Sequence, residues 1–237
     1  NDQIKTQLLI GAGGHFCPVA WQAGKSAAEK VVVAAKEIEF KMSGEQAASC
    51  AVSGEMPELY FCPDMLGYGW CFRKENFLNI GLGRRDNRYL SAHINGFISW
   101  LKSSGRIPFD LPAQLKGHAY HTYDQKARNR VDDGMLLIGD AAGMAFSESG
   151  EGILPAVESG LLAADAILAC NGNYNRQRLG QYEIALTKRF GNPDAFDPLD
   201  LLPASVKRFL GRRILASPRL TRRIVVEGWF LHYGKDE

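Results

Sequence analysis

Residues 134–169 read GMLLIGDAAGMAFSESGEGILPAVESGLLAADAILA, and the interpretation of the whole chain depends on this stretch. The apolar run Met135–Ile138 is bounded by glycines and predicts a short buried strand. Asp140 follows at the carboxyl end of that strand, where open α/β sheets place groups that accept hydrogen bonds from a ligand. Gly150 and Gly152 come next, and glycines at a helix start let a flat or anionic group approach bare backbone N–H groups. The stretch therefore predicts a cofactor site.

The apolar positions after the glycine pair follow the 3.6-residue period of a helix. They are Ile153, Leu154, Val157, Leu161, Ala164, Ile167 and Leu168. Taken alone, Gly-Asp-Ala-Ala-Gly at 139–143 is also an ordinary turn sequence. The predicted ligand site therefore depends on the complete order of strand, carboxylate, short loop, glycine pair and helix.

Composition indicates a globular protein with reduced cysteines. The chain has 237 residues, of which 46% are hydrophobic and 23% charged, enough for one large core or two smaller ones. A formal net charge of +2 is too small to indicate nucleic-acid binding. Five cysteines without a CxxC pair predict free thiols in a cytoplasm. No apolar run reaches the length of a membrane span and no signal-peptide pattern is present, so we expect a cytoplasmic protein.

The N-terminal segment contains a second glycine turn. Leu8–Ile10 predicts a strand that turns through Gly11 and Gly13 into a short helix near Pro18. The glycines suggest a dinucleotide fingerprint, but a G-x-G-x-x-G spacing would require glycine at Phe16. We therefore do not assign the adenosine-binding unit of a cofactor domain to this segment.

Residues 31–123 differ in character and predict an antiparallel sheet covered by one helix. Short β-rich runs separated by turn residues predict strands at 31–41, 58–62, 67–73, 77–82 and 115–123. Residues 44–54 are small and polar, which we interpret as a loop or a weak strand. Residues 89–104 carry an apolar stripe at helical spacing and predict an amphipathic helix.

Alternate residues of the strand at 67–73 are aromatic. Tyr68, Trp70 and Phe72 point to one face of an extended strand. The plainer interpretation is that this face packs on the core. The alternative is an aromatic wall for a long hydrocarbon, which is bound by area rather than by hydrogen bonds. Arg73 follows as either a solvated charge or a partner for a phosphate or carboxylate head group.

Histidines offer no clear catalytic or metal-binding arrangement. His118 and His121 are three residues apart, which places them on opposite faces of a strand, so we predict no metal site. His15 lies beside the first glycine turn, where it either approaches a bound cofactor or, as we favour, is a surface or capping residue. No residue is assigned as a catalytic acid or nucleophile.

The arrangement at 134–169 resembles the second FAD motif of the p-hydroxybenzoate hydroxylase-like flavoproteins, and within them the geranylgeranyl reductase family. That family reads close to GDAAG, a few residues, [ST]GEGI, and a helix containing SG and AA. The matching residues are Gly139–Gly143, Ser149–Ile153, Ser159–Gly160 and Ala163–Ala164. Tyr68, Trp70 and Phe72 match the family's Y-x-W-x-F-P motif, in which Arg73 replaces the proline. The resemblance covers most of residues 7–170.

The resemblance implies an FAD-dependent oxidoreductase in which reduced flavin delivers a hydride to an isoprenoid double bond. The implied cofactor-binding residues are Gly11, Gly13, Gly139, Asp140, Ala141, Gly150, Glu151, Gly152 and Ile153. The implied substrate-binding residues are Tyr68, Trp70, Phe72 and Arg73. The substrate would be a small molecule or a lipid, and the reductant would be NAD(P)H or a ferredoxin-type donor. Gly13 stands where the family has aspartate.

We expect an α/β fold, α+β overall: a partial, Rossmann-like FAD-binding domain with an inserted antiparallel substrate domain and a helical C-terminal region. The expected FAD-binding domain comprises residues 1–30 and 124–172, the substrate domain residues 31–123, and the C-terminal region residues 173–237. Because no G-x-G-x-x-G unit is present, we expect the C-terminal portion of a longer flavoprotein, or a remnant without the ADP-binding half.

The tail at 206–229 interleaves basic and apolar residues. It is either a solvated helical cap or an attachment to an anionic membrane surface.

Two alternative functions remain. The first is an aromatic-substrate monooxygenase or halogenase of the same fold, although the tryptophan-rich motif of halogenases is not found. The second is a non-catalytic binding module, which the missing ADP-binding unit favours. Failure of the purified chain to bind FAD would support the second alternative.

Overall fold

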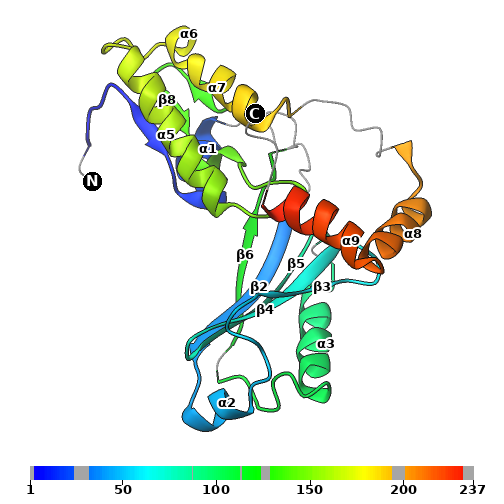
Figure 1. Cartoon of the computed structure of the whole chain (residues 1–237). Helices are drawn as coiled ribbons and strands as arrows, with labels where there is room; N and C mark the ends of the chain where they lie inside the picture. Colours follow the sequence, from blue (N-terminus) through cyan, green and yellow to red (C-terminus); the bar gives the residue numbers. More distant parts are fainter. Residues whose placement is uncertain are drawn as a thin grey trace. The chain divides into compact units, whose positions relative to one another are not determined.

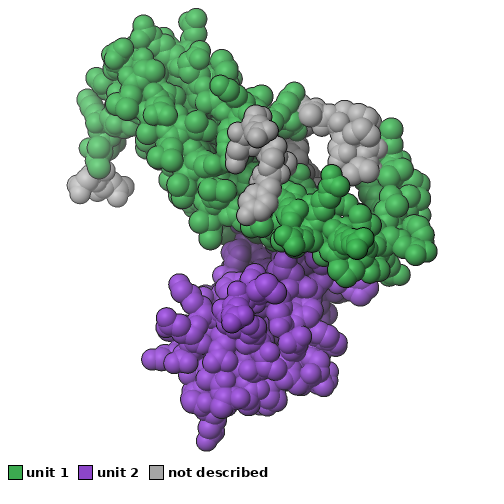
Figure 2. Space-filling view, in the orientation of Figure 1, with its two compact units in different colours: residues 1–30, 120–237 green, residues 31–119 purple. Residues whose placement is uncertain are grey.

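The computed structural model describes residues 3–23, 32–86, 88–112, 114–123, 129–193 and 201–231. The chain divides into two compact units, which Figure 2 distinguishes by colour. Unit 1 consists of residues 1–30 and 120–237, and unit 2 consists of residues 31–119. Val31, expected to begin a strand, and the expected domain boundary at residue 124 lie outside the described residues.

Unit 1 contains a three-stranded sheet with the strand order β1-β8-β7 (Figure 1). Its strands are β1 (Leu9–Gly11), β8 (Met135–Leu137) and β7 (Val131–Asp132). β1 runs parallel to β8, whereas β7 is antiparallel to β8. Both predicted strands of this unit are thus present and paired side by side.

Each parallel strand passes through a glycine turn into a short helix. β1 is followed by the 3-10 helix η1 (Gly14–Phe16) and by α1 (Pro18–Ala23), and β8 is followed by α4 (Gly139–Ala142). Asp140 therefore lies in the first turn of a four-residue helix, where the sequence had suggested a loop. The longer helix α5 (Ile153–Ala169) begins directly after Gly152, as predicted.

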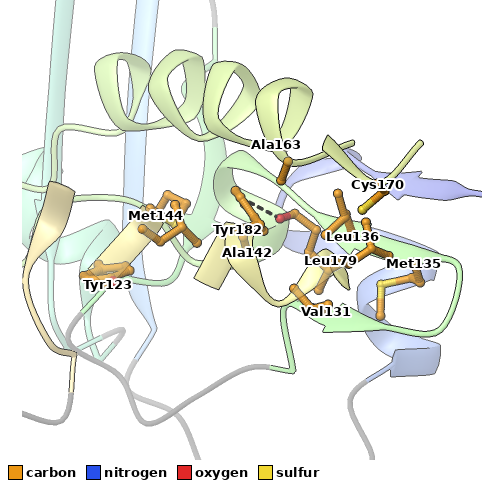
Figure 3. Packing of buried hydrophobic residues seen from close by; sticks show 13 residues of the cluster. Tyr123, Val131, Met135, Leu136, Ala142, Met144, Ala163, Cys170, Leu179 and Tyr182 are labelled. Atoms are coloured by element: carbon orange, nitrogen blue, oxygen red, sulfur yellow. Dashed lines mark hydrogen bonds between the residues drawn. The ribbon is translucent and has the colours of Figure 1, made fainter. Parts of the chain in front are cut away.

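The core of unit 1 lies between this sheet and helices α5, α6 (Arg176–Leu179) and α7 (Gln181–Phe190), as Figure 3 shows. Leu136 and Tyr182 are fully buried in it. The Tyr182 hydroxyl donates a hydrogen bond of 3.0 Å to the carbonyl oxygen of Leu137 on β8. This bond ties α7 to the strand that leads to Asp140. The helix expected over 175–190 is thus divided in two at Gly180.

Unit 2 is a five-stranded sheet with the order β3-β4-β5-β2-β6 and one covering helix (Figure 1). The strands are β2 (Val33–Lys41), β3 (Glu58–Phe61), β4 (Gly67–Lys74), β5 (Phe77–Arg84) and β6 (Lys116–Tyr120). Neighbouring strands from β3 to β2 pair in antiparallel fashion. Helix α3 (Leu90–Ser103) buries Ile94 and Leu101 against the sheet. The antiparallel sheet and the helix agree with the prediction.

One segment of unit 2 differs from its prediction. Residues expected to form a loop or weak strand contain a helix, α2 (Gly44–Ser49). The Ser43 hydroxyl accepts a hydrogen bond from the Gln46 backbone N–H, and the Gln46 side chain accepts one from the Ser43 N–H. This reciprocal capping box satisfies two of the N–H groups that a helix start leaves without partners, so a short polar helix forms.

The described C-terminal residues are helical. They form α8 (Ala204–Leu215), α9 (Pro218–Leu220) and a π-helical segment, η3 (Thr221–Phe230). Among the helices of the described residues, none is both long enough and apolar enough to cross a bilayer.

Candidate functional site

The glycine turns after β1 and β8 lie next to each other because their strands are parallel neighbours. Gly11 is paired in register with Leu137, and the backbone N–H of Ile138 donates to the Gly11 carbonyl at 3.0 Å. The helices η1 and α4 that follow the two turns are also in contact. The carboxyl edge of a parallel sheet is where α/β proteins bind their ligands. The fold thus brings together the turn at Gly11 and the turn after Leu137, which are more than 120 residues apart in sequence.

Gly11 and Gly13 are explained by close packing within this turn. A Cβ atom at Gly11 would lie 2.5 Å from Cδ2 of Leu137, and one at Gly13 would lie 3.2 Å from Cα of Cys17. Gly11 therefore excludes a larger side chain for a structural reason, and Gly13 is tightly packed. Cofactor binding by Gly11 and Gly13 stays a prediction.

Asp140 and Gly152 meet at the start of α5. Oδ1 of Asp140 lies 3.3 Å from the point that a Cβ of Gly152 would occupy, which is closer than ordinary van der Waals contact. The partly exposed Asp140 carboxylate thus lies beside bare backbone at the amino end of a 17-residue helix. Such a helix end attracts negative charge and offers N–H donors. An acceptor and a set of donors are therefore side by side, which suits a ligand that carries both hydroxyl and carbonyl groups.

The loop before α5 is held in a conformation that glycine favours. Gly150 has φ +70°, and a Cβ there would lie 2.4 Å from the Tyr120 hydroxyl oxygen. Glu151 accepts a hydrogen bond of 2.9 Å from the Leu154 backbone N–H, so its carboxylate caps the first turn of α5. Ile153 is 82% exposed. These contacts give Glu151 a structural role, and its predicted contact with a cofactor stays a prediction.

Sequence reasoning missed Ser159 as part of this site. Its hydroxyl is buried, accepts a hydrogen bond of 3.0 Å from the Gly139 backbone N–H and donates one of 2.9 Å to the Ala156 carbonyl. Ser159 thereby fixes α5 against the turn that carries Asp140 and Ala141. Its position seven residues beyond Gly152, or about two helical turns, is the available sequence signal, because that spacing places both residues on one face of the helix.

The histidines singled out in the sequence differ in burial. The rings of His15 and His121 are 4.7 Å apart at 35°, and Nδ1 of the half-buried His15 lies in the interior. His121 is buried, and the side chain of His118 is 46% exposed. Within the described ranges, no group of three or more His, Cys, Asp or Glu side chains is placed to hold a metal ion.

The aromatic residues of β4 lie on the sheet face away from α3. Gly69 and Cys71 point toward the helix side, where the Phe97 ring lies 2.7 Å from a Cβ built at Gly69. Tyr68 and Trp70 are half-buried on the other face, with ring centroids 6.1 Å apart, and Phe72 is 37% exposed. The plainer interpretation, that this face packs on the core, is therefore wrong. We call Tyr68, Trp70 and Phe72 the aromatic wall.

The neighbouring strand determines how Trp70 lies. Trp70 is paired with Gly81, and a Cβ at Gly81 would lie 2.1 Å from Cζ2 of the indole. The indole N–H donates to Oδ1 of Asn79 at 2.8 Å, and Nδ2 of Asn79 donates to Oε2 of Glu39 at 3.3 Å. Gly81 thus leaves space for the Trp70 indole, and Asn79 fixes the orientation of the indole through the hydrogen bond. Asn79 and Glu39 were not recognised from the sequence as members of this face.

Arg73 is not brought together with the aromatic wall. It follows Phe72 and therefore points to the opposite face. Its guanidinium donates to the carbonyl oxygens of Glu75, at 2.8 Å, and Ala47, at 3.1 Å. These bonds hold the end of α2 against β4. Its predicted contact with a substrate head group has no support from this geometry.

We expect Gly81→Ala to disturb Trp70 selectively. The added methyl group would overlap the indole, so the free energy of unfolding should fall by about 1–3 kcal/mol. Urea unfolding measures the loss, and the indole N–H resonance of Trp70 in a ¹H–¹⁵N spectrum should shift because the bond to Asn79 is strained. Gly96→Ala in α3 is the matched control, since nothing lies within 4 Å of a Cβ there. Equal stability and an unmoved resonance in Gly81→Ala would contradict the packing described.

A separate depression of about 460 Å³ lies at the other end of α5. It is lined by Ala169, Cys170, Asn175, Gln177, Arg178 and Gln181. Helix α5 spans 17 residues, or roughly 25 Å, so this depression is remote from Asp140 and Gly152. It contains none of the residues predicted for the site.

Comparison with known proteins gives curated relatives that include digeranylgeranylglycerophospholipid reductases and a geranylgeranyl diphosphate reductase. No family model matches the chain. A digeranylgeranylglycerophospholipid reductase of Methanocaldococcus jannaschii is 31% identical over 192 residues, which are 76% of this chain and 46% of that protein. The chain thus spans about half the length of the curated relatives it matches.

Solved structures share the fold. A geranylgeranyl bacteriochlorophyll reductase-like protein of Thermoplasma acidophilum aligns with a TM-score of 0.65 at 21% identity, covering 93% of this chain and 62% of its own. A variant of the halogenase PltM in complex with FAD aligns with a TM-score of 0.58 at 12% identity, covering 78% and 42%. The predicted fold class, a mixed α/β fold with an antiparallel sheet, is confirmed.

Proposed function

Because this chain belongs to the geranylgeranyl reductase family, we propose that it forms part of an FAD-dependent oxidoreductase that reduces isoprenoid double bonds. The proposal rests on the close approach of the Asp140 carboxylate to Gly152 at the amino end of α5. That meeting lies at the carboxyl edge of the parallel strand pair, where ligand sites of α/β proteins are built.

The residues present fit an FAD molecule. A side chain at position 152 would crowd the Asp140 carboxylate, so the glycine leaves backbone open at the helix end. Asp140 would accept hydrogen bonds from ribityl hydroxyl groups, and the backbone from Gly150 to Ile153 would face the edge of the isoalloxazine ring. The N–H groups of Gly152 and Ile153 would be the donors, because those of Gly150 and Glu151 donate to the Phe146 carbonyl and the Ser149 hydroxyl. When bound, FAD supplies the hydride chemistry. The donors of the helix end would stabilise negative charge on the ring, and Ser159 would keep the turn of Asp140 in place.

The aromatic wall supports a prenyl chain as substrate. Tyr68, Trp70 and Phe72 present apolar area on a sheet face that α3 does not cover. An isoprenoid chain has no hydrogen-bonding groups, so it would be held by burial of its apolar surface, at about 25 cal/mol for each Å². The bond from Trp70 to Asn79 leaves the indole face, rather than its N–H, for contact with the substrate.

An additional polypeptide segment is needed to complete the cofactor site, and exposed apolar surface supports this part of the proposal. Within the described sheet, β1 is an edge strand, and its Leu9 and Ile10 are 46% and 43% exposed. Five large residues of α5 are also exposed: Ile153, Leu154, Val157, Leu161 and Leu168. Exposed apolar residues in such number, when they form one patch, mark an interaction site. We propose that the ADP-binding half covers it.

The proposal is tested by cofactor binding and product analysis. FAD is titrated into this chain alone and into this chain with the N-terminal half of the M. jannaschii reductase, and flavin fluorescence reports binding. The assembled protein, reduced with dithionite without air, should add two hydrogens to each reduced double bond of a geranylgeranyl lipid, as mass spectrometry measures.

The alternatives give other results in the same experiment. A monooxygenase or halogenase would leave the lipid unchanged and accumulate a flavin hydroperoxide in air with NAD(P)H. A non-catalytic module would bind no FAD, alone or with the added half. Either result would contradict the proposed reduction.

A further inference from the structure

Helix α4, which carries Asp140, is too short to hold its own position. It has four residues, and so short a helix is marginal by itself because helix nucleation is unfavourable. No side chain caps it at Ile138, and Gly143, with φ +68°, ends it. The Ser159 hydroxyl accepts a hydrogen bond from the Gly139 N–H at the amino end. The position of Asp140 therefore depends on contacts with the rest of unit 1.

Arg130 forms the corresponding contact at the carboxyl end of α4. Its Nε donates a hydrogen bond of 2.9 Å to the carbonyl oxygen of Ala142, the last residue of the helix. Its own carbonyl oxygen accepts one of 2.9 Å from the backbone N–H of Leu137 on β8. Arg130 thus binds the chain on both sides of Asp140. A cation at the carboxyl end of a helix is also favoured by the helix dipole.

The Arg130 side chain is held in a fixed orientation. It is only 5% exposed, and its Cζ lies 4.9 Å from the centroid of the Tyr123 ring. The Tyr123 hydroxyl donates to the Gly191 carbonyl at 3.1 Å, and burial raises the pKa of this hydroxyl, so it stays a neutral donor. The ring also packs against Phe190, with centroids 5.6 Å apart. A planar guanidinium can stack on the ring and donate from Nε in a set direction, which an ammonium group cannot do.

We propose that Arg130 is a positioning residue that keeps the Asp140 carboxylate beside Gly152, in the place that FAD binding needs. The inference rests on the proposed function, because it deepens the role given there to Asp140. Arg130 acts through Asp140 and contributes no atom to the cofactor contact. A hydrogen bond weakens steeply when its atoms move out of line, so a shifted turn would lose affinity for FAD without losing the carboxylate itself.

A double-mutant cycle on FAD binding tests the proposal. The chain is assembled with the N-terminal half of the M. jannaschii reductase, and flavin fluorescence gives the dissociation constant. Arg130→Met removes the donor but keeps a long side chain, and it should raise the dissociation constant about tenfold while Asp140 is present. In an Asp140→Ala background the same change should have no further effect. A merely structural role would give the same factor in both backgrounds, and this result, or no change in either, would overturn the proposal.

Hydrogen exchange in the full chain tests the turn without any flavin. The Gly143 N–H donates to the Asp140 carbonyl at 3.1 Å, within the turn that Arg130 holds. Arg130→Met should speed exchange of this amide about tenfold, because the turn opens more easily. Unchanged exchange would overturn the proposal. If the unaltered assembly binds no FAD, the proposed function fails, and the exchange rate still decides whether Arg130 holds Asp140 in place.

Two further variants separate positioning from a general loss of stability. Arg178→Met removes a similar bond, of 3.1 Å to the Cys170 carbonyl, at the carboxyl end of α5, and should leave FAD affinity and Gly143 exchange unchanged. An effect as large as that of Arg130→Met would count against the proposal. Arg130→Lys keeps the charge without the planar donor, so both of its values should lie between those of Arg130→Met and the unaltered protein. Circular dichroism verifies folding, and if Arg130→Met does not fold, Arg130→Lys takes its place in the cycle.

Discussion

Replacing Asp140 with alanine is expected to lower the affinity for FAD by about ten- to a hundredfold. A hydrogen bond to a charged group contributes roughly 1.5–3 kcal/mol, and each 1.4 kcal/mol corresponds to a tenfold change in the dissociation constant. The carboxylate lies beside Gly152 at the amino end of α5, so its removal deletes an acceptor while the backbone donors stay. Flavin fluorescence, measured on the chain assembled with the N-terminal half of the reductase, gives the dissociation constant.

Two further variants make the Asp140 result specific. Asp140→Asn keeps one acceptor oxygen without charge, so its affinity should lie between those of the alanine variant and the unaltered protein. Asp165→Ala removes an exposed carboxylate from α5 and should leave FAD affinity unchanged. If Asp140→Ala binds FAD as tightly as Asp165→Ala does, Asp140 does not contact the cofactor.

Tyr182→Ala is expected to cost about 3–5 kcal/mol in the free energy of unfolding, the range for removing a buried aromatic side chain. Tyr182 is fully buried, and its hydroxyl bonds the Leu137 carbonyl of β8 (Figure 3). Tyr182→Phe keeps the ring and loses only the hydrogen bond, at about 1 kcal/mol. Urea unfolding measures both losses. An alanine variant no less stable than the phenylalanine variant would show that the ring contributes little to the core.

Tyr182 also makes the free energy of unfolding depend on pH. Burial raises the pKa of the Tyr182 hydroxyl above its ordinary value of 10.0, because the phenolate would lose its hydration. In the unfolded chain this tyrosine releases its proton near that ordinary value. The unfolded state therefore binds fewer protons than the folded state above pH 10, and the free energy of unfolding should fall as the pH rises further. Below pH 10 the contribution is constant. Tyr182→Phe should lack this part of the alkaline decline.

Several elements could be predicted from the sequence because local pattern determines them. The alternation of apolar and polar residues predicted the sheet of unit 2, and the helical period predicted α3 and α5. The three-residue spacing of a capping box, from Ser43 to Gln46, also determines α2, but its polar composition led us to expect a loop or weak strand. The reciprocal hydrogen bonds between Ser43 and Gln46 stabilise a helix there, although the composition is small and polar.

The candidate site was only partly predictable. The order of Asp140 and the glycines of 150–152 indicated a ligand site, but Ser159 and Asn79 were given no role in a site. Ser159 acts through a hydrogen bond to Gly139 on another element, and Asn79 acts through one to Trp70 on the neighbouring strand. Arg73 was grouped with the aromatic wall by adjacency in sequence. On a strand, adjacent side chains point to opposite faces, and this placed Arg73 on Ala47 instead.

The sequence by itself determined the strands and helices, the faces they offer and the family, because these follow from periodicity and from short runs of matching residues. Only the tertiary structure decided that α3 covers the sheet face opposite Tyr68 and Trp70, and that the turn of Gly11 adjoins the strand of Asp140. Which surfaces meet depends on packing between segments far apart in the chain. The energy of that packing comes from burying both partners at once, so neither segment carries a signal of it alone.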